Sequence, residues 1–134
     1  MFKVQGQTYE CYIEFTLKII GGKWKTLILW YLKDGKKRFG ELRRLLPKCT
    51  QRMLTRQLRE LEHDGIVARK IYRQIPPKVE YSLTNRGETL KPILELACDW
   101  GVNRANELNT VRQIKDRKDT FKNSVKVLEN FCVP

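Results

Sequence analysis

Polar and basic side chains recur along one side of the segment that spans residues 50–63. Leu54, Leu58 and Leu61 recur at i, i+4 and i+7, which predicts an amphipathic helix with the leucines on its buried face. Arginine and glutamine can make paired hydrogen bonds to a guanine or adenine edge, and threonine can bind a phosphate or contact a thymine methyl group. The residues expected to make such contacts are Thr50, Gln51, Arg52, Thr55, Arg56 and Arg59.

The charge of the chain favours a polyanionic partner. The 134 residues include 27 Lys and Arg against 15 Asp and Glu, which gives a formal net charge of +12. Between Arg38 and Lys78 there are eleven basic residues and four acidic ones. Glu60, Glu62 and Asp64 stand at the C-terminal end of the predicted helix, where we expect them to oppose phosphate groups least. The basic residues expected to contact the DNA backbone from outside this helix are Arg38, Arg69, Lys70, Arg73 and Lys78.

Other classes of function find little support in the sequence. No Ser/His/Asp set, glycine-rich phosphate loop or pair of carboxylates indicates an active site, so we do not expect an enzyme. The four cysteines are widely spaced and His63 is the single histidine, so we expect free thiols, no metal site and no cofactor. No segment has the apolar length of a membrane span, and residues 1–10 lack a signal pattern. We therefore expect a cytoplasmic protein without a membrane partner.

The N-terminal part of the chain is expected to form three helices before residues 50–63. They are predicted at residues 12–20, 23–32 and 39–46, where apolar residues recur with helical spacing. The second helix is expected to be largely buried, along a stripe formed by Trp24, Leu27, Ile28 and Tyr31.

After Gly65 the spacing of the apolar residues changes from helical to strand-like. Residues 66–73 and 78–83 are rich in Val, Ile and Tyr, and the prolines between them predict a hairpin with a stiff tip. Thr84 is expected to cap one long helix that continues to about Leu108, with a kink at Pro92. Three helices followed by a two-stranded hairpin is the order of a winged helix-turn-helix, a mainly α fold with a small β-hairpin.

Four ordered motifs resemble those of HxlR-type transcriptional regulators, which are related to MarR regulators. They are GGKW at residues 21–24, FGELRR at 39–44, MLTRQLRELE at 53–62 and PPKVEYSLT at 76–84. The resemblance implies a bacterial repressor that binds a pseudo-palindromic double-stranded DNA operator as a homodimer, through helices at both ends of a domain spanning residues 1–108. Residues 109–134 extend past the part that the family shares, and the spacing of their apolar residues is compatible with one further helix. The candidate dimer interface consists of Ile13, Leu17, Leu90, Leu94, Ala97 and Trp100.

Two cysteines are candidates for sensing an oxidant or a small-molecule effector. Members of the family commonly carry a cysteine just before the first helix, and several use it to sense quinones, aldehydes or oxidants, so the resemblance implies Cys11 as a candidate redox sensor. A retained thiol without a sensing role is the alternative. Cys49 precedes Thr50 and stands near Lys48 and Arg52, where the helix dipole and the cations are expected to favour the thiolate.

A different use of the same fold remains an alternative. A winged helix can also bind nucleic acid without sequence preference or serve as a protein-interaction module. A packaging protein needs lysines and arginines but no amide that recognises a base. The presence of Gln51 beside Arg52, Thr55 and Arg56 therefore favours a sequence-specific regulator.

Overall fold

The computed structural model describes residues 1–109 of the protein. The chain divides into two compact units, Met1–Glu88 and Thr89–Pro134, and each is described by itself. The expected C-terminal extension, residues 109–134, lies outside the described residues except for Asn109 at the end of the last helix.

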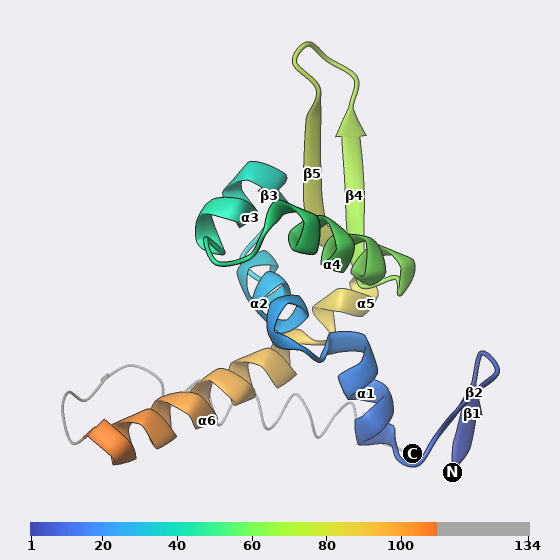
Figure 1. The fold of residues 1–134 in the computed structure, drawn as a ribbon, viewed down its shortest axis with the longest axis vertical. Helices are drawn as coiled ribbons and strands as arrows, with labels where there is room; N and C mark the ends of the chain where they lie inside the picture. The colour runs from blue at the N-terminus through green and yellow to red at the C-terminus, as the bar shows by residue number, and fades with distance from the viewer. Residues whose placement is uncertain (110–134) are drawn as a thin grey trace. The chain divides into compact units, whose positions relative to one another are not determined.

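The first unit has the element order of a winged helix-turn-helix (Figure 1). Four helices are followed by a hairpin of two longer strands, and this confirms the fold class expected from the sequence. The third and fourth helices, joined by a short turn, form the helix-turn-helix. The helices are α1 (Tyr12–Ile20), α2 (Lys23–Leu32), α3 (Phe39–Leu45) and α4 (Gln51–His63), and the hairpin consists of β4 (Val67–Tyr72) and β5 (Lys78–Leu83).

The core of this unit forms where α4 packs on α2. The predicted leucine face of α4, formed by Leu54, Leu58 and Leu61, is almost completely buried. Burial of one such side chain contributes about 1.5–3 kcal/mol to folding. In α2 the expected stripe is rotated, because Trp24, Leu27 and Tyr31 are only half-buried. Its most buried apolar residues are Ile28, Leu29 and Leu32.

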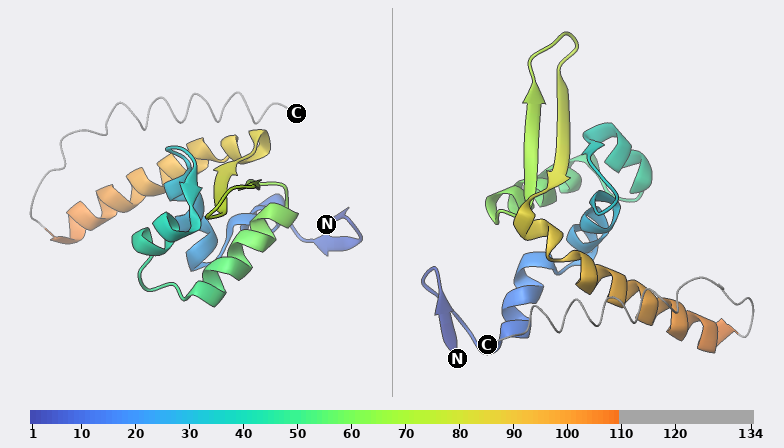
Figure 2. Two further views of the ribbon diagram at one scale, coloured as in Figure 1. Left: turned by 90° about the horizontal axis from the view of Figure 1, so that it is seen from above. Right: turned by 180° about the vertical axis from the view of Figure 1, so that it is seen from behind.

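The hairpin belongs to a three-stranded antiparallel sheet with the strand order β3-β5-β4. The strand β3 (Lys37–Arg38) pairs with β5, Lys37 opposite Tyr81, and was not predicted from the sequence. β4 pairs with β5 from Val67 opposite Leu83 to Tyr72 opposite Lys78. We call β4, β5 and the connecting residues 73–77 the wing, which projects away from the helices of its unit in Figure 1 and in the right-hand view of Figure 2.

A buried carboxylate within β5 links the wing to the start of β3. Glu80 accepts a hydrogen bond from the Tyr72 hydroxyl at 3.1 Å and forms ion pairs with Lys78 at 2.7 Å and Lys36 at 3.4 Å. The hydrogen bond from Lys78, reinforced by Tyr72 and the charge of Lys36, lowers the pKa of Glu80 to about 2. The ammonium groups of Lys70 and Lys78 each lie 4.8 Å from the centroid of the Tyr72 ring. Glu80 thus links β5 to Tyr72 of β4 and to Lys36, the residue before β3, through polar side chains.

An N-terminal hairpin precedes α1 and was not predicted. Its strands are β1 (Phe2–Val4) and β2 (Gln7–Tyr9). The turn residues Gln5 and Gly6 both have positive φ, at 48° and 81°, which is the conformation of a tight two-residue hairpin turn. The rings of Phe2, Tyr9, Tyr12 and Phe15 form a cluster that packs the hairpin on the start of α1.

The predicted long C-terminal helix is two helices. The Thr84 hydroxyl accepts a hydrogen bond from the Gly87 backbone N–H at 3.1 Å and caps α5 (Asn85–Glu88), as expected for Thr84. The chain then begins α6 (Lys91–Asn109), so Pro92 lies in a first helical turn and does not kink a longer helix. Proline is tolerated there because the first N–H groups of a helix have no intrahelical acceptor. Neither α6 nor any other described helix is long and apolar enough to cross a membrane.

The lowered pKa of Glu80 makes a prediction about acid stability. Its contribution to folding is present above the ordinary pKa of a glutamate and is lost as the pH falls from there toward about 2. A Glu80→Gln variant should therefore unfold at a lower temperature than the wild type at pH 7, and the difference should shrink through this acidic range. Thermal unfolding followed by circular dichroism tests this, with the exposed Glu10→Gln as control. A difference that stays constant with pH would contradict it.

Candidate nucleic-acid interface

The start of α4 is built to receive an anion. The Thr50 side chain accepts a hydrogen bond from the Met53 backbone N–H at 3.1 Å, so Thr50 is the N-cap residue that the sequence predicts. Other N–H groups of the first turn lack intrahelical acceptors, and the helix dipole makes this end positive. Thr50 is exposed, and the end that it caps can therefore bind a phosphate group.

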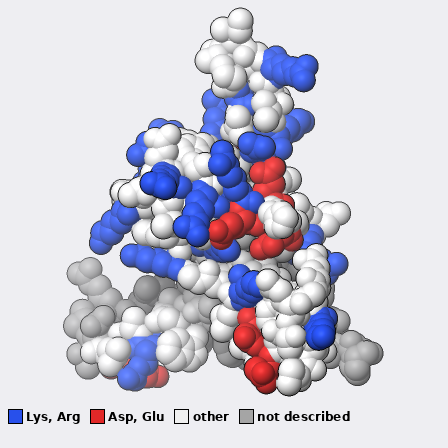
Figure 3. Space-filling view, turned by 45° about the vertical axis from the view of Figure 1, so that its right-hand side comes forward, with Lys and Arg blue, Asp and Glu red and all other residues white. Residues whose placement is uncertain are grey.

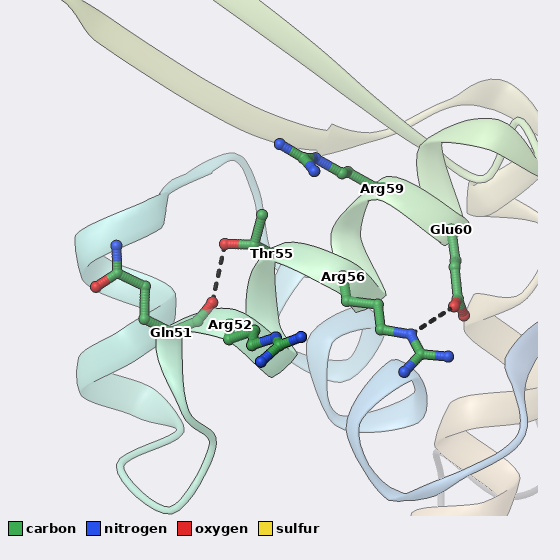
Figure 4. A pocket seen from close by; sticks show the side chains of 6 residues that line it. All are labelled: Gln51, Arg52, Thr55, Arg56, Arg59 and Glu60. Atoms are coloured by element: carbon green, nitrogen blue, oxygen red, sulfur yellow. Dashed lines mark hydrogen bonds and ion pairs between the residues drawn. The ribbon is translucent and has the colours of Figure 1, made fainter.

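The predicted contact residues of α4 line one concave surface (Figure 4). They lie opposite the buried leucines, and the three arginines among them are exposed. Five of the six lining residues are predicted contact residues, and the sixth is acidic. We call this surface the polar face of α4: Gln51, Arg52, Thr55, Arg56, Arg59 and Glu60.

Local hydrogen bonds orient two of these side chains. The Thr55 hydroxyl donates to the Gln51 backbone carbonyl at 2.8 Å, which occupies its hydrogen and leaves its methyl group for an apolar contact. Arg43 of α3 donates to the Gln51 side-chain oxygen at 3.4 Å, a long bond that a base can replace. A threonine methyl group and a glutamine amide are groups that can contact a thymine methyl group and an adenine edge.

Basic residues of the wing differ in whether their charges are paired with carboxylates of the protein. Arg73 and Lys70 are exposed, whereas Arg69 forms a 3.4 Å ion pair with Glu62 of α4. Lys78 is half-buried and its ammonium is bound to Glu80, so the predicted contact of Lys78 with DNA must compete with this pair. Arg38 is exposed at the end of β3.

Basic side chains gather on the part of the surface that carries the wing and α4. Figure 3 shows Lys and Arg along the wing and over the helices below it, with a few acidic side chains among them. On α4 and beside the wing, Glu60 and Glu62 bind arginines. The basic side chains of α4 and the wing are of the type that can contact phosphate groups.

Apolar side chains are exposed on two helices outside this surface. Ile13 and Leu17 are exposed on α1, as expected for a dimer interface. On α6 the exposed fraction of Trp100 is 69% and Ala97 is exposed, whereas Leu90, just before α6, is half-buried. Leu94 is only 3% exposed in the single chain, and its place in a dimer interface stays a prediction.

A comparison with known protein families assigns the chain. The family described as "HxlR-like helix-turn-helix" matches residues 19–109, which include the helix-turn-helix, the wing and α6. The chain belongs to this family. It is thus a helix-turn-helix transcriptional regulator from a DNA-binding family, and not an enzyme.

Individual relatives agree with this assignment. The HTH-type transcriptional regulator YdeP of Bacillus subtilis is 56% identical over 110 residues, which are 80% of this chain and 86% of YdeP. The solved structure of the redox regulator HypR in its oxidised form is 55% identical, has a TM-score of 0.67, and covers 78% of this chain and all of that chain. A MarR-family structure from Enterococcus faecalis is 39% identical with a TM-score of 0.66, over 82% of this chain and all of that one.

The cysteines of this HxlR-like protein lie in contrasting environments. Cys11 is exposed and precedes the first residue of α1, whereas Cys49 is only 4% exposed. Burial raises the pKa of the Cys49 thiol, so the expectation that the α4 dipole and nearby cations favour a thiolate there is wrong. Cys98 is half-buried on α6, and Cys132 lies outside the described residues. Within residues 1–109 no cluster of three His, Cys, Asp or Glu residues is suited to a metal ion.

Two charged residues of the site were not singled out by the sequence. Glu60 was assigned to the end of α4 away from DNA, but its carboxylate lies on the polar face and binds Arg56 at 3.3 Å. Lys25 reaches Glu60 from α2 at 2.7 Å. A signal for Lys25 was present, because it precedes the buried Ile28, Leu29 and Leu32 by three, four and seven residues.

The different environments of Cys11 and Cys49 predict different rates of alkylation. Cys11 should react with iodoacetamide at neutral pH much faster than Cys49, because Cys49 is both inaccessible and less often a thiolate. Peptide mass spectrometry after timed labelling measures the two rates separately. Labelling in denaturant is the control and should make them similar, while equal rates in the folded protein would contradict the burial of Cys49.

Proposed function

We propose that this HxlR-like protein binds a pseudo-palindromic DNA operator as a homodimer and represses the genes beside it. One observation carries the proposal: the polar face of α4 presents Gln51, Arg52, Thr55, Arg56 and Arg59 on the side of the helix opposite its buried leucines. In the proposed complex α4 enters the major groove and the wing contacts the neighbouring backbone. The protein acts in the cytoplasm, where bacterial DNA lies.

The chemistry of the polar face supports sequence-specific binding. Arg52, Arg56 and Arg59 can donate paired hydrogen bonds to guanine, and Gln51 can exchange hydrogen bonds with adenine. Arg69, Lys70, Arg73 and Arg38 contribute phosphate contacts, which add affinity without recognising sequence. A non-specific nucleic-acid-binding or protein-interaction module is the alternative, and it gives no role to Gln51 or to the outward methyl group of Thr55.

A second copy of the chain is the proposed partner of the exposed apolar residues. Tyr12, Ile13 and Leu17 are exposed on α1, and Trp100 and Leu108 are exposed on α6. Exposed apolar side chains of this size are unfavourable in water and can mark an interface between proteins. In a two-fold dimer the two α4 helices would lie about 34 Å apart, the repeat of one turn of DNA, so each would contact one half-site.

Removal of one arginine from the polar face tests operator binding. The protein should protect a short palindrome upstream of its own gene or of a divergent neighbour, with an affinity that falls steeply as salt increases. Arg56→Ala should weaken this binding by roughly tenfold to a hundredfold, the usual value of a paired contact to a base. Footprinting at two salt concentrations measures both effects.

A matched control for this test lies on α6. Arg104 is exposed and paired with Glu107 at 2.9 Å, so Arg104→Ala removes the same charge from a different helix and should leave operator affinity nearly unchanged. Diffuse protection that does not depend on sequence and is equally strong in Arg56→Ala would overturn operator binding. That result would favour the non-specific module.

We further propose that Cys11 makes operator binding sensitive to oxidants. Its thiol is exposed and precedes α1, and the similar protein HypR is a redox regulator solved in oxidised and reduced forms. Hydrogen peroxide converts a thiolate into a sulfenic acid with release of hydroxide, and a quinone adds to it covalently. Either product would change the surface beside the exposed apolar residues of α1 and so alter the dimer.

Operator affinity in the presence of peroxide tests this role of Cys11. The wild type should lose affinity on oxidation and recover it with a thiol reductant, while Cys11→Ser should keep its affinity throughout. Cys98→Ser, which removes a half-buried thiol, should respond like the wild type. A response that persists in Cys11→Ser would show that Cys11 is a retained thiol without a sensing role.

A further inference from the structure

Glu60 is the acidic member of the polar face of α4, where a negative charge should oppose DNA. Its side chain is 41% exposed, and Oε1 accepts a hydrogen bond from Arg56 Nε at 3.3 Å (Figure 4). An exposed ion pair between residues four apart on a helix is weak by itself. Glu60 would therefore hold Arg56 only loosely if nothing else fixed its carboxylate.

Lys25 fixes the carboxylate of Glu60 from the interior. Its Nζ lies 2.7 Å from Glu60 Oε2, and its side chain is only 11% exposed. The residue belongs to α2, which is anchored in the core by Ile28, Leu29 and Leu32. The hydrogen bond from Lys25 is the main reason that the pKa of Glu60 is lowered, so the carboxylate is ionised at neutral pH. The two carboxylate oxygens thus have different partners: Oε2 binds Lys25 and Oε1 binds Arg56.

The hydrogen bond between Arg56 and Glu60 determines which atoms of Arg56 remain available to contact DNA. A guanidinium has five N–H donors, and the single Nε–H of Arg56 is used by Glu60. Its two terminal NH₂ groups are the pair that an arginine uses to contact guanine O6 and N7 end-on. The Arg56 side chain is 72% exposed, so this end of the guanidinium is accessible.

We propose that Glu60, held by Lys25, is a positioning residue that makes Arg56 select for sequence. The inference rests on the proposed function, because it assumes that the polar face of α4 contacts bases. Glu60 acts in two ways, and both raise the affinity for the operator relative to that for other DNA. It orients the terminal NH₂ groups of Arg56 for a base, which strengthens operator binding, and its charge repels phosphates wherever no base contact compensates, which weakens binding to other DNA.

The quantity to measure is the ratio of affinities for operator and scrambled DNA. The operator is a duplex selected by the full-length protein from random sequences, and the scrambled duplex has the same composition. Glu60→Gln should lower this ratio by roughly tenfold, because Arg56 becomes mobile and non-specific binding becomes stronger. Lys25→Met should lower it as well, because a carboxylate released from α2 can draw the whole guanidinium of Arg56 away from the base.

Two controls separate positioning from general effects of charge and folding. Glu62→Gln removes the same charge from the same helix but from the partner of Arg69, so it should leave the ratio unchanged. In an Arg56→Ala background, Glu60→Gln should have no further effect on the ratio, because without the base contact of Arg56 the charge of Glu60 acts equally on both duplexes. Thermal unfolding shows whether each variant is folded. If Lys25→Met does not fold, Glu60→Gln still provides the test, because Glu60 is partly exposed.

The outcomes distinguish this inference from the proposed function. If Arg56→Ala loses operator affinity while Glu60→Gln keeps the wild-type ratio, the positioning role is wrong and operator binding by α4 stands. If Glu60→Gln lowers the ratio equally with and without Arg56, Glu60 acts through the fold and the inference is again wrong. If Arg56→Ala has no effect on either DNA, the proposed function fails and this inference fails with it.

Discussion

The arrangement of the whole DNA-binding unit depends on the burial of one face of α4. Leu54, Leu58 and Leu61 together contribute roughly 5–9 kcal/mol through burial, which is comparable to the total stability of a small domain. Rotation of α4 about its axis would expose them, so its opposite face must remain outside. The wing begins directly after this helix, where the Ile66 N–H donates to the Leu61 carbonyl at 3.0 Å and the Thr84 hydroxyl donates to the Gly65 carbonyl at 2.6 Å. The same leucines therefore set the direction of α4 and the root of the wing.

Carboxylates control how the positive charge of this surface is presented. Each acts on basic side chains that would otherwise repel one another and adopt many conformations. Glu80 holds Lys36 and Lys78 along the wing, and Glu62 holds Arg69 beside α4. The result is a basic surface in which some cations are fixed in place while others, such as Arg52 and Arg73, are exposed.

Much of this fold could be predicted because its signals are local. Apolar spacing predicted α1, α2 and β5 with the observed bounds, and Thr50 predicted the start of α4. Features that depend on pairing between distant residues were missed, such as β3, whose two residues are too short to show a period and form a strand only against β5. The separation of α5 from α6 was missed although the sequence contains a signal for it. Thr84 and Pro92 are each compatible with a helix start, and two starts close together imply two helices. In the site, the exposed face of α4 could be predicted from the positions of its leucines. The Lys25–Glu60 pair joins two helices, so no regular spacing in the sequence reveals it.

We propose that α4 occupies the major groove of DNA with its polar face toward the bases. Chemical methylation of guanine N7 reports on this directly, because N7 faces the major groove. On the operator bound by the full-length protein, the account predicts two clusters of protected guanines separated by about one helical turn, about 34 Å, on one face of the duplex. Guanines that remain fully reactive at N7 in the saturated complex would contradict the account.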